Sequence, residues 1–352
     1  MNPEIIQQKL QRLRAFYESG GTRTLAFRKH QLQLLKTIML KYEQSLYDAL
    51  YSDLKRSPEE SWVTELGVVM AEINLALRSL PHWMQRERVK TNLVNLPSSS
   101  FVLREPLGVV FIISPWNYPL QLLFTPLVGA IAAGNCVVLK PSELAPATAK
   151  VMGEIIKEIF SDEYILFVEG DGGQVVPALM NNFRFNHVFY TGSTAVGKLI
   201  YQMAATQLTP VTLELGGKSP CVVESDANIS VAARRIAVTK FSNAGQMCIA
   251  PDYVLVHTSK KNELIAALKN AIRSFYSDNA AESYNYCKII NEKQFQRLVG
   301  YLAQGTIVHG GGHNISQLYL EPTILENVPL DSPLMREEIF GPVLPVLTFN
   351  TL

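Results

Sequence analysis

The sequence has little excess charge of either sign and few cysteines. Its 32 basic and 31 acidic residues leave a net charge of +1, so no general electrostatic field would attract nucleic acid or an anionic membrane. The four cysteines include no CxxC pair and are too sparse for a disulfide framework, which favours a reducing compartment. We therefore expect a cytoplasmic protein that does not bind nucleic acid.

Export and membrane signals are also lacking. Residues 1–14 are polar and charged and have no apolar core of the kind found in a secretory signal. The most apolar stretch, residues 120–139, is interrupted by a glutamine, a proline and the Gly134–Asn135 pair. A membrane-spanning helix would tolerate these residues poorly, so the pattern favours a buried helix that leads into a strand. No stable membrane association is indicated.

The composition is typical of a folded protein with a large interior. Of the 352 residues, 47% are hydrophobic and 18% are charged, and a chain of this length exceeds what one hydrophobic core usually supports. We therefore expect at least two substructures, and two lobes suit an enzyme with a cleft between them.

The first hundred residues predict helices followed by an excursion. Apolar residues recur at helical spacing from Leu35 to Leu50 and again from Val63 to Leu80, so the first eighty residues are predicted to be helical. Between Val89 and Arg104, short extended segments are broken by a proline and three serines. This pattern predicts a protruding hairpin, a feature that often serves assembly.

After residue 105, short apolar runs alternate with helical segments, as in a parallel sheet with crossover helices. The predicted strands are Gly108 to Ile113, Cys136 to Leu139, Tyr164 to Val168 and His187 to Tyr190. A second series begins near Cys221, with predicted helices over 229–241 and 262–275 and a strand over 252–257. It predicts a second α/β lobe.

Cys248 is the first candidate for chemistry. It follows a Gly-Gln turn in the segment FSNAGQMCIAP, residues 241–251. A thiol on such a turn can be presented into a cleft and can act as a nucleophile where its surroundings favour the thiolate. A buried, inert cysteine is the commoner case, so the local sequence alone favours a structural role.

Two predicted strand ends carry further candidates. Glu214, in TLELGGKSP, precedes a flexible glycine pair, where a partly desolvated carboxylate could act as a general base. A surface or ion-paired glutamate is favoured on this segment alone. Asn117, in SPWNYP, follows an apolar strand and could donate its amide to a developing oxyanion. A structural turn around a buried Trp116 explains that segment equally well.

Two other segments could hold a nucleotide. In LKPSE, Lys140 and Glu143 lie three residues apart after a strand and could bind a ribose diol, although an ion pair in solvent fits equally well. In YTGSTAVGK, a strand runs into a helix, and Gly192 and Gly197 are five apart. This spacing is neither a GxGxxG fingerprint nor a P-loop, but a glycine before a helix N-terminus lets phosphate approach backbone N–H groups.

Together, and in the order in which they follow one another along the chain, these five segments resemble the aldehyde dehydrogenase superfamily. The likeness is closest to its class 3 branch, through GQMCIAPDY at 245–253 and the short helical N-terminus. It extends to LMREEIFGPV at 334–343. The resemblance implies an aldehyde dehydrogenase-like α/β fold, with a Rossmann-like cofactor lobe, a catalytic lobe and a protruding oligomerisation ribbon.

The resemblance also implies the domain organisation. The expected regions are an N-terminal helical region of the NAD-binding domain (1–88), the oligomerisation ribbon (89–104), the Rossmann-like NAD(P)-binding domain (105–217) and the catalytic domain (218–352). Members of the superfamily continue past a strand such as the one predicted over 343–349. We therefore expect the catalytic domain to be incomplete at its C-terminus, and the full-length protein to form a homodimer.

The activity implied by the resemblance is NAD(P)-dependent oxidation of an aldehyde to a carboxylic acid. Cys248 would be the nucleophile, Asn117 and the Cys248 backbone N–H would form the oxyanion hole, and Glu214 would activate water. Lys140 and Glu143 would hold the adenosine ribose, the Gly192–Gly197 turn would lie by the pyrophosphate, Glu338 would bind the nicotinamide ribose and Phe340 would pack near the nicotinamide. The implied cofactor-binding residues are Trp116, Lys140, Ser142, Glu143, Gly192, Ser193, Thr194, Ala195, Val196, Gly197, Leu215, Glu338 and Phe340. No metal is implied.

NAD is the expected cofactor because a 2′-phosphate would meet the Glu143 carboxylate, although class 3 relatives often use NADP as well. The expected partner is a small-molecule aldehyde. Two alternatives stay open. In a coenzyme A-acylating relative, coenzyme A would take the acyl group in place of water, and Glu214 argues against this. A catalytically silent nucleotide-binding fragment is favoured only by the abrupt end of the sequence.

Overall fold

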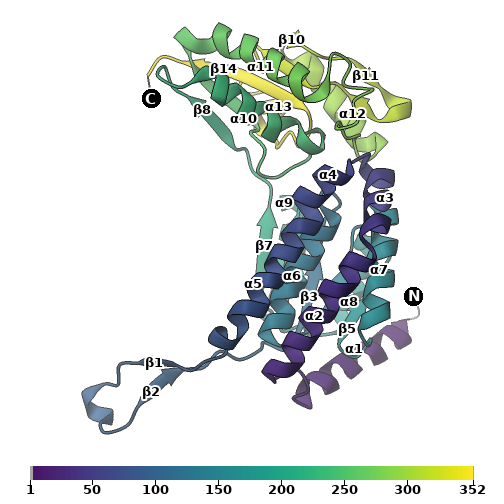
Figure 1. The fold of residues 1–352 in the computed structure, drawn as a ribbon, viewed down its shortest axis with the longest axis vertical. Coiled ribbons are helices and arrows are strands. Elements are labelled where there is room, and N and C mark those ends of the chain that lie inside the picture. Colours follow the sequence, from purple (N-terminus) through teal and green to yellow (C-terminus); the bar gives the residue numbers. More distant parts are fainter. Residues whose placement is uncertain (1–2, 352) are drawn as a thin grey trace. The chain divides into compact units, whose positions relative to one another are not determined.

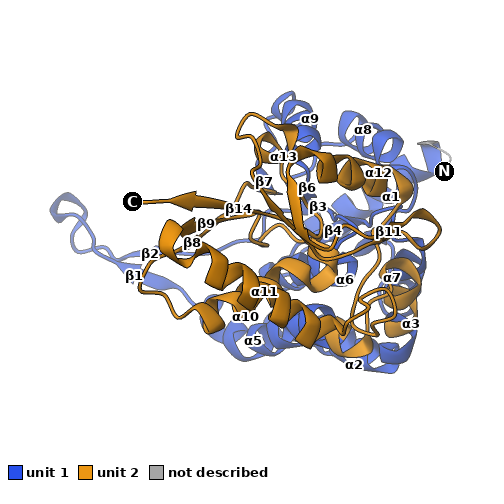
Figure 2. Cartoon of the chain, turned by 90° about the horizontal axis from the view of Figure 1, so that it is seen from above, with its two compact units in different colours: residues 1–46, 62–214 blue, residues 47–61, 215–352 orange. Residues whose placement is uncertain are grey.

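The computed structural model describes residues 3–351 and divides the chain into two compact units (Figures 1 and 2). Unit 1 consists of residues 1–46 and 62–214, and unit 2 of residues 47–61 and 215–352. Each unit contains a five-stranded sheet of its own. The expected α/β architecture with two lobes is confirmed.

Unit 1 contains most of the helices that precede residue 206. They are α1 (Pro3–Glu18), α2 (Leu25–Lys41), the first turn of α3 (Glu43–Leu54), a π-helical turn η1 (Trp62–Leu66), α5 (Gly67–Trp83), a 3-10 turn η2 (Leu93–Asn95), α6 (Pro119–Ala133), α7 (Pro146–Ile159), α8 (Gly172–Asn182) and α9 (Thr194–Ala205). The strands are β1 (Glu87–Val89), β2 (Ser100–Val102), β3 (Val109–Ile113), β4 (Cys136–Lys140), β5 (Ile165–Phe167), β6 (His187–Gly192) and β7 (Val211–Leu215). The predicted helical N-terminal segment and the four predicted strands are confirmed.

The main sheet of unit 1 has the strand order β5-β4-β3-β6-β7. The β3–β4, β3–β6 and β4–β5 pairs are parallel. From the central strand β3, the chain first builds outward through β4 and β5 and then crosses to β6 on the other side. The order of strands therefore reverses between β3 and β6, and the crevice beyond the carboxyl ends of such strands is where open α/β sheets bind ligands.

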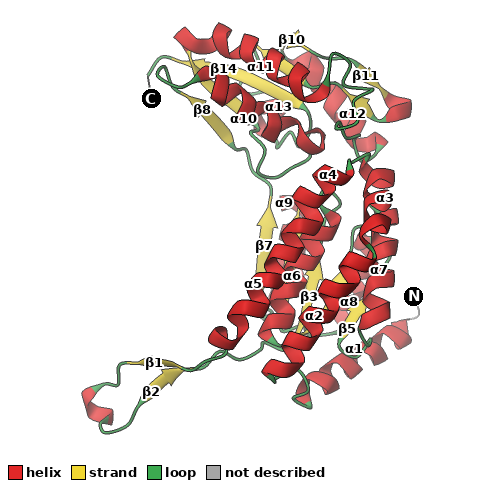
Figure 3. Ribbon diagram, viewed as in Figure 1, coloured by secondary structure: helices red, strands yellow, loops and turns green. Residues whose placement is uncertain are grey.

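Helices cover both faces of this sheet, with the strands between them (Figure 3). Helices α6 and α7, which connect β3, β4 and β5, pack with α2 and α5 in one layer. Helices α8 and α9 pack together and belong to the crossovers on the other side of the reversal, so right-handed connections place them on the opposite face. Buried on both faces, β3 and β4 contain mostly aliphatic residues, and all five positions of each strand are buried.

The predicted buried helix that leads into a strand is also confirmed. Residues 120–139 form most of α6 and of β4, and Gly134 ends the helix in a left-handed conformation with φ of 87°. None of the helices within residues 3–351 has both the length and the apolar character needed to cross a membrane.

A hairpin leaves unit 1 between α5 and β3. Strands β1 and β2 pair antiparallel, with Glu87 opposite Val102, and Figure 1 shows the hairpin extending away from the helices of this unit. The protruding hairpin expected over 89–104 is therefore present and begins slightly earlier. Its large apolar side chains are exposed, namely Val89, Leu93, Val94, Leu96, Phe101, Val102 and Leu103.

Unit 2 contains the remaining elements. Its helices are the rest of α3, α4 (Pro58–Ser61), α10 (Ile229–Phe241), α11 (Lys261–Tyr276), α12 (Glu292–Tyr301) and α13 (Pro333–Arg336), and its 3-10 turns are η3 (Ser242–Gly245), η4 (Thr258–Lys260), η5 (Leu302–Gln304) and η6 (Ile315–Gln317). Its strands are β8 (Pro220–Val223), β9 (Tyr253–His257), β10 (Thr306–His309), β11 (His313–Asn314), β12 (Tyr319–Leu320), β13 (Thr323–Glu326) and β14 (Val343–Phe349). The second predicted helix–strand–helix series and the predicted strand at 343–349 are confirmed.

The sheet of unit 2 has the order β10-β13-β14-β9-β8. The β13–β14, β14–β9 and β9–β8 pairs are parallel, whereas β10 pairs antiparallel with β13. Helices α10 and α11 pack together and bury side chains such as Ala233, Phe241 and Leu268 in one continuous apolar core. This core supports the loops that carry the candidate residues of unit 2.

The segment 47–61 groups with unit 2 although it lies within the N-terminal helical region. The Lys288 side chain donates to the carbonyl of Ser52 at 2.7 Å, and the Lys288 backbone N–H donates to the carbonyl of Leu54 at 3.0 Å. Lys55 Nζ donates to the carbonyl of Ala281 at 3.0 Å. These bonds join positions more than two hundred residues apart in the sequence, so periodicity could not reveal them.

Candidate active site

Cys248 lies just beyond α10, after the 3-10 turn over Ser242–Gly245. Within this turn Asn243 and Ala244 have left-handed backbone conformations, with φ of 49° and 51°. The chain therefore reverses sharply before it reaches the cysteine. The Cys248 side chain is half-buried, so it is packed by its neighbours and still partly accessible.

Two buried amides fix this turn. The Asn243 backbone N–H donates to Oε1 of Glu60 at 2.9 Å, and its side chain donates to the carbonyl of Gln246 at 3.0 Å. Gln246 Nε2 donates to the carbonyls of Asn243 at 2.9 Å and Lys288 at 3.0 Å, while its Oε1 accepts from the N–H of Ile290 at 3.0 Å. Both amides are fully buried, and buried amides that are hydrogen-bonded to the backbone hold a loop in one conformation.

Burial disfavours the thiolate form of the other three cysteines. None of the four forms a disulfide within the described chain. Burial raises the pKa of the Cys136 thiol to about 12, and burial also raises the pKa values of the Cys221 and Cys287 thiols. A higher pKa lowers the fraction of thiolate, which is the reactive form.

Asn117 lies in unit 1, between the carboxyl end of β3 and the first turn of α6. The segment begins with a hydrogen bond from the Ser114 N–H to the carbonyl of Lys140 at 3.1 Å. Asn117 is 2% exposed, and Trp116 beside it is half-buried. The amide is therefore held at the carboxyl edge of the sheet, where the sequence predicted it.

Lys140 and Glu143 follow β4 at the same edge. The Lys140 ammonium is buried and donates to the carbonyl of Pro141 at 2.5 Å and to Oε2 of Glu143 at 2.9 Å. The Glu143 side chain is 41% exposed. Burial alone would raise the pKa of the Glu143 carboxyl. The hydrogen bond from Lys140, together with those from the backbone N–H groups of Glu143 and Gly172, has the larger effect, so the pKa is lowered. An ion pair and a diol-binding pair both fit the geometry of Lys140 and Glu143. Ser142, which lies between these two residues in the sequence, is buried.

The turn after β6 exposes the N-terminus of α9. Ser193 caps the helix by accepting from the Val196 N–H at 3.4 Å. Residues 193–196 are exposed, whereas Gly197 is buried against the sheet side of the helix. The exposed first turn of α9, which follows Gly192 directly, has the geometry that accepts an anion.

Two buried hydroxyls lie where the strand order reverses. Ile113 of β3 pairs with Tyr190 of β6, so the next residues, Ser114 just after β3 and Thr191 near the end of β6, lie at the same level of adjacent strands. Their hydroxyl oxygens are buried and have no hydrogen-bond partner among residues 3–351. Buried polar groups are normally satisfied, so this edge has the donors and acceptors that a polar ligand would use.

Glu214 lies on β7, near the end of unit 1, and its side chain is exposed. Leu215, the next residue, is half-buried. The strand end that the sequence predicted for Glu214 is therefore present.

Glu338 and Phe340 lie on the loop between α13 and β14 in unit 2. Oε1 of Glu338 accepts from the Gly217 N–H at 3.3 Å. Burial raises the pKa of the Glu338 carboxyl, and the Gly217 N–H offsets part of that effect. Phe340 has a left-handed backbone with φ of 49°, an uncommon conformation for a bulky residue that needs support from its surroundings.

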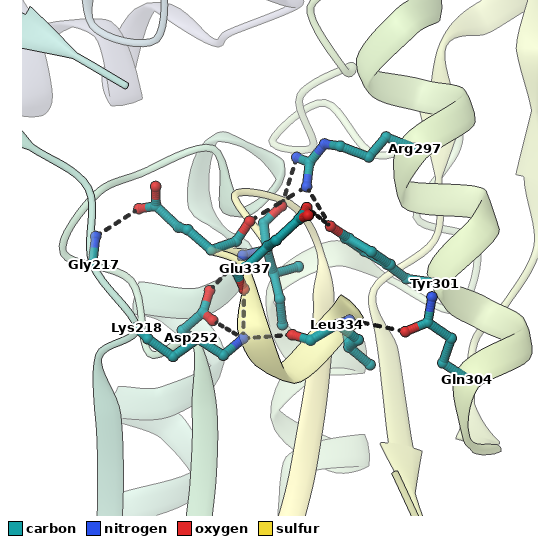
Figure 4. Close-up of polar contacts among 10 residues, drawn as sticks. Gly217, Lys218, Asp252, Arg297, Tyr301, Gln304, Leu334 and Glu337 are labelled. Atoms are coloured by element: carbon teal, nitrogen blue, oxygen red, sulfur yellow. Dashed lines mark hydrogen bonds and ion pairs between the residues drawn. The ribbon is translucent and has the colours of Figure 1, made fainter. Parts of the chain in front are cut away.

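Some of that support comes from Lys218 and Asp252 (Figure 4). Asp252 is buried directly before β9, and its Oδ1 accepts from the Ile339 N–H at 2.9 Å. Its other oxygen pairs with Lys218 Nζ. Lys218 Nζ also donates to the carbonyls of Leu334 at 2.5 Å and Glu337 at 2.8 Å. One ion pair therefore ties α13 and the first part of the loop to the segments that lead into β8 and β9.

Arg297 of α12 supports the loop from the other side, as Figure 4 shows. Its guanidinium donates to the carbonyls of Ile339 at 2.8 Å and Glu338 at 3.3 Å. It also donates to the Tyr301 hydroxyl at 3.0 Å, and this hydroxyl donates to Oε2 of Glu337 at 3.0 Å. The planar guanidinium thus fixes the two carbonyls that lie just before Phe340.

Sequence reasoning missed Lys218, Asp252 and Arg297. The available signal was weak. Lys218 and Asp252 are oppositely charged and directly precede two neighbouring parallel strands, but charge before a strand is common. In the sequence, Arg297 stands four residues before Tyr301 in a helical pattern, as many surface arginines do. Only the tertiary structure shows that it supports the loop before Phe340.

The three glycines at 310–312 connect β10 and β11. Among the residues that the structure describes, no group of three or more histidine, cysteine, aspartate or glutamate side chains could hold a metal ion.

The family model for the aldehyde dehydrogenase family matches residues 6–352. The chain therefore belongs to the aldehyde dehydrogenase family, and it is an enzyme of the oxidoreductase class. The 4,4'-diaponeurosporen-aldehyde dehydrogenase of Staphylococcus aureus is 46% identical over 350 residues, which cover 99% of this chain and 76% of that protein. Aldehyde dehydrogenase family 3 member B1 of Rattus norvegicus is 46% identical over 346 residues, or 98% of this chain and 74% of the relative. The predicted likeness to class 3 is confirmed.

Solved structures agree with this assignment. The substrate-bound state of Staphylococcus aureus AldH superposes with a TM-score of 0.96 at 45% identity and covers 100% of this chain and 76% of that one. The predicted aldehyde dehydrogenase-like fold is confirmed. Other relatives bind either nicotinamide cofactor: one from Rattus norvegicus is named dimeric NADP-preferring, and an indole-3-acetaldehyde dehydrogenase was solved in complex with NAD+.

Proposed function

We propose that this aldehyde dehydrogenase oxidises its substrate to a carboxylic acid in two stages, with Cys248 as the covalent nucleophile. The observation that carries the proposal is the rigid turn around Asn243 and Gln246, which holds a half-buried cysteine beyond α10. Of the other cysteines, Cys136 and Cys287 are fully buried, and burial opposes thiolate formation.

In the first stage, the Cys248 thiolate adds to the aldehyde carbon and forms a thiohemiacetal. The negative charge that develops on oxygen is stabilised by the Asn117 amide and the Cys248 backbone N–H, the arrangement that lowers the barrier to acyl transfer. A bound nicotinamide cofactor supplies the hydride acceptor that makes this stage an oxidation. The carbonyl then reforms, and the acyl group remains on Cys248 as a thioester.

In the second stage, Glu214 accepts a proton from water as the water oxygen adds to the thioester carbon. The exposed position of this carboxylate on β7 is compatible with access to water. The C–S bond breaks, the carboxylic acid leaves and the Cys248 thiolate is restored. A general base of this kind is needed because water alone attacks a thioester slowly.

We propose that the cofactor binds at the carboxyl edge of the unit 1 sheet. The buried hydroxyls of Ser114 and Thr191 and the exposed first turn of α9 support this position. Lys140 and Glu143 would hold the adenosine ribose, and the turn from Gly192 to Gly197 would face the pyrophosphate. The other proposed contacts are Trp116, Ser142, Leu215, Glu338 and Phe340.

The lowered pKa of Glu143 keeps its carboxylate charged at neutral pH. A 2′-phosphate next to this charge is repelled, whereas a ribose 2′-hydroxyl can donate to it. We therefore propose NAD as the preferred cofactor and NADP as a weaker one. The relative named NADP-preferring is 42% identical, so this preference is a property to be measured for each member.

The proposed domain roles follow from these sites. Residues 105–217, together with the helical residues 1–88, form the NAD(P)-binding domain, residues 218–352 form the catalytic domain, and the hairpin around 89–104 serves assembly. The exposed apolar side chains of this hairpin support the last role, because such patches commonly mark protein interfaces. We propose a homodimer, as in the relative that is named dimeric.

The test compares Cys248→Ala with Cys221→Ala, since both cysteines are half-buried. Cys248→Ala is expected to abolish NADH formation and to keep NAD binding, and Cys221→Ala is expected to keep both. Glu214→Gln is expected to give a burst of NADH without turnover. Turnover by Cys248→Ala would contradict the assignment, and an acyl-coenzyme A product in place of the acid would contradict the role of water.

A further inference from the structure

Glu65 is a buried carboxylate that the proposed mechanism does not use. It is 0% exposed, and a charged group is removed from water only at a considerable free-energy cost unless polar partners replace the lost hydration. Two of its partners lie on α6. Oε2 of Glu65 accepts from the backbone N–H groups of Leu120 at 2.8 Å and Gln121 at 2.9 Å.

These two N–H groups are ones that a helix cannot satisfy by itself. The first turn of any α-helix has N–H groups without intrahelical partners, and a side chain at the preceding position usually accepts from them. In α6 that position is Tyr118, which makes no side-chain capping bond, and Pro119 begins the helix. Glu65, more than fifty residues earlier in the sequence, therefore caps α6 from outside.

An unusual turn brings Glu65 to this position. It belongs to the π-helical turn η1, which precedes α5. A Cβ atom on Gly67 would lie 2.7 Å from the carbonyl oxygen of Trp62, so the turn requires glycine there. A π turn shifts the side chains before it by one position relative to those after it, and such turns often occur at functional sites.

The capped end of α6 adjoins Asn117. The segment that carries Asn117 is anchored on one side by the bond from the Ser114 N–H to the Lys140 carbonyl at 3.1 Å. On the other side it is anchored by Glu65 through Leu120. Each anchor lies three residues from Asn117, so both constrain the backbone that carries the Asn117 amide.

The charge on Glu65 is also suited to this role. Two N–H donors to one oxygen favour the carboxylate form, and a negative charge at a helix N-terminus is stabilised by the helix dipole. The dipole and the two N–H groups offset the charge locally. Glu65 can therefore fix the helix without opposing an oxyanion that forms near Asn117.

We propose that Glu65 is a positioning residue for the oxyanion step, because it fixes the N-terminus of α6 and thereby the direction of the Asn117 amide. This inference rests on the proposed role of Asn117. Glu65 itself donates nothing to the substrate, and its effect on rate passes entirely through Asn117.

The experiment measures the rate of the NADH burst and the KM for NAD in the full chain. Glu65→Gln keeps the shape but removes the charge, and we expect it to slow the burst about tenfold or more, since small misplacements of catalytic groups are costly. The KM for NAD is expected to change by less than about twofold. Glu65→Asp keeps the charge on a shorter side chain and should lose less.

Glu158→Gln serves as the matched control. This carboxylate also joins two segments of unit 1, but its bonds go to Lys41 at the end of α2 and to Tyr42 after it, not to the N-terminus of α6. The control is expected to keep the wild-type burst rate. A similar loss in Glu158→Gln and Glu65→Gln would show a general effect of loosening the unit and would overturn the proposal.

The decisive comparison is with Asn117→Ala. In that background, Glu65→Gln should cost nothing further, because the amide that it positions is gone. If the two substitutions slow the burst additively in the double variant, the positioning role is overturned. It is also overturned, without loss of the oxyanion role, if Asn117→Ala is slow while Glu65→Gln has a normal burst. A normal burst in Asn117→Ala would overturn the proposed oxyanion role and the positioning role together.

Discussion

A Cβ atom added to Gly216 would lie 1.9 Å from Oε2 of Glu338. The carboxylate therefore rests directly on the backbone that follows β7, where only the absence of a side chain leaves room for it. The neighbouring Gly217 N–H donates to the other carboxylate oxygen at 3.3 Å. The glycine pair, which the sequence marked only as flexible, is a close-packed support for a proposed cofactor-binding residue.

Gly216→Ala is predicted to displace the Glu338 side chain. Because the obstructed atom is the end of a flexible side chain, the fold should survive with a stability loss of about 1 kcal/mol or less. Turnover with NAD should fall about fivefold or more, because the carboxylate no longer holds its position. Gly217→Ala is the control, since its Cβ would meet only Ser219 Oγ at 3.8 Å. Equal kinetics for Gly216→Ala and the wild type would refute the prediction.

Glu338→Gln is predicted to stabilise the fold while it lowers activity. Burial raises the pKa of the Glu338 carboxyl above its ordinary value of 4.5. Between the ordinary pKa, which applies to the unfolded chain, and the higher pKa of the folded chain, the folded chain binds more protons than the unfolded chain. The free energy of unfolding therefore falls as pH rises through this window. The glutamine variant lacks this loss and should gain stability relative to the wild type at neutral pH. Urea unfolding across the acidic to neutral range, with Glu337→Gln as control, measures the difference.

If the stability difference between Glu338→Gln and the wild type is the same at every pH, the Glu338 carboxyl does not titrate as predicted. A gain of stability in Glu337→Gln would instead point to the general charge of the loop.

Arg297→Met is predicted to loosen the loop before Phe340. The variant loses the bonds to the carbonyls of Glu338 and Ile339, which should cost about 1–3 kcal/mol of stability. It should also raise the KM for NAD more than it changes the KM for the aldehyde. Arg234→Met is the control, because Arg234 is exposed and lies over the Phe275 ring in the same unit. A loss of stability without any change in the NAD kinetics would limit Arg297 to a structural role.

Glu143→Gln is predicted to weaken the preference for NAD. Removal of the carboxylate removes its repulsion of a 2′-phosphate and one strong acceptor for the ribose. The ratio of kcat/KM for NAD to that for NADP should therefore fall about tenfold. Glu163→Gln changes an exposed carboxylate of the same unit and should leave the ratio unchanged. A wild-type enzyme that already prefers NADP would contradict the premise.

The sequence by itself determined the secondary-structure elements and indicated the family. The alternation of apolar runs and helical segments located β3, β4, β5 and β6, because the side-chain periodicity of a strand or helix is a local property. It also singled out candidate residues at strand ends and turns, such as Cys248, Glu214 and Asn117, because the kind of chemistry that a thiol, a carboxylate or an amide can do is a property of the residue type. The order of these motifs pointed to the family.

Only the tertiary structure decided how these groups are held. The bonds from Gly217 to Glu338, from Gln121 to Glu65 and from Lys288 to Ser52 join residues that are 121, 56 and 236 positions apart. No local pattern encodes such pairs, because a backbone N–H or carbonyl is the same at every residue and its partner is set by packing. For the same reason Arg297 and Glu65 read as ordinary helix residues until the loop and the helix end that they support are seen beside them.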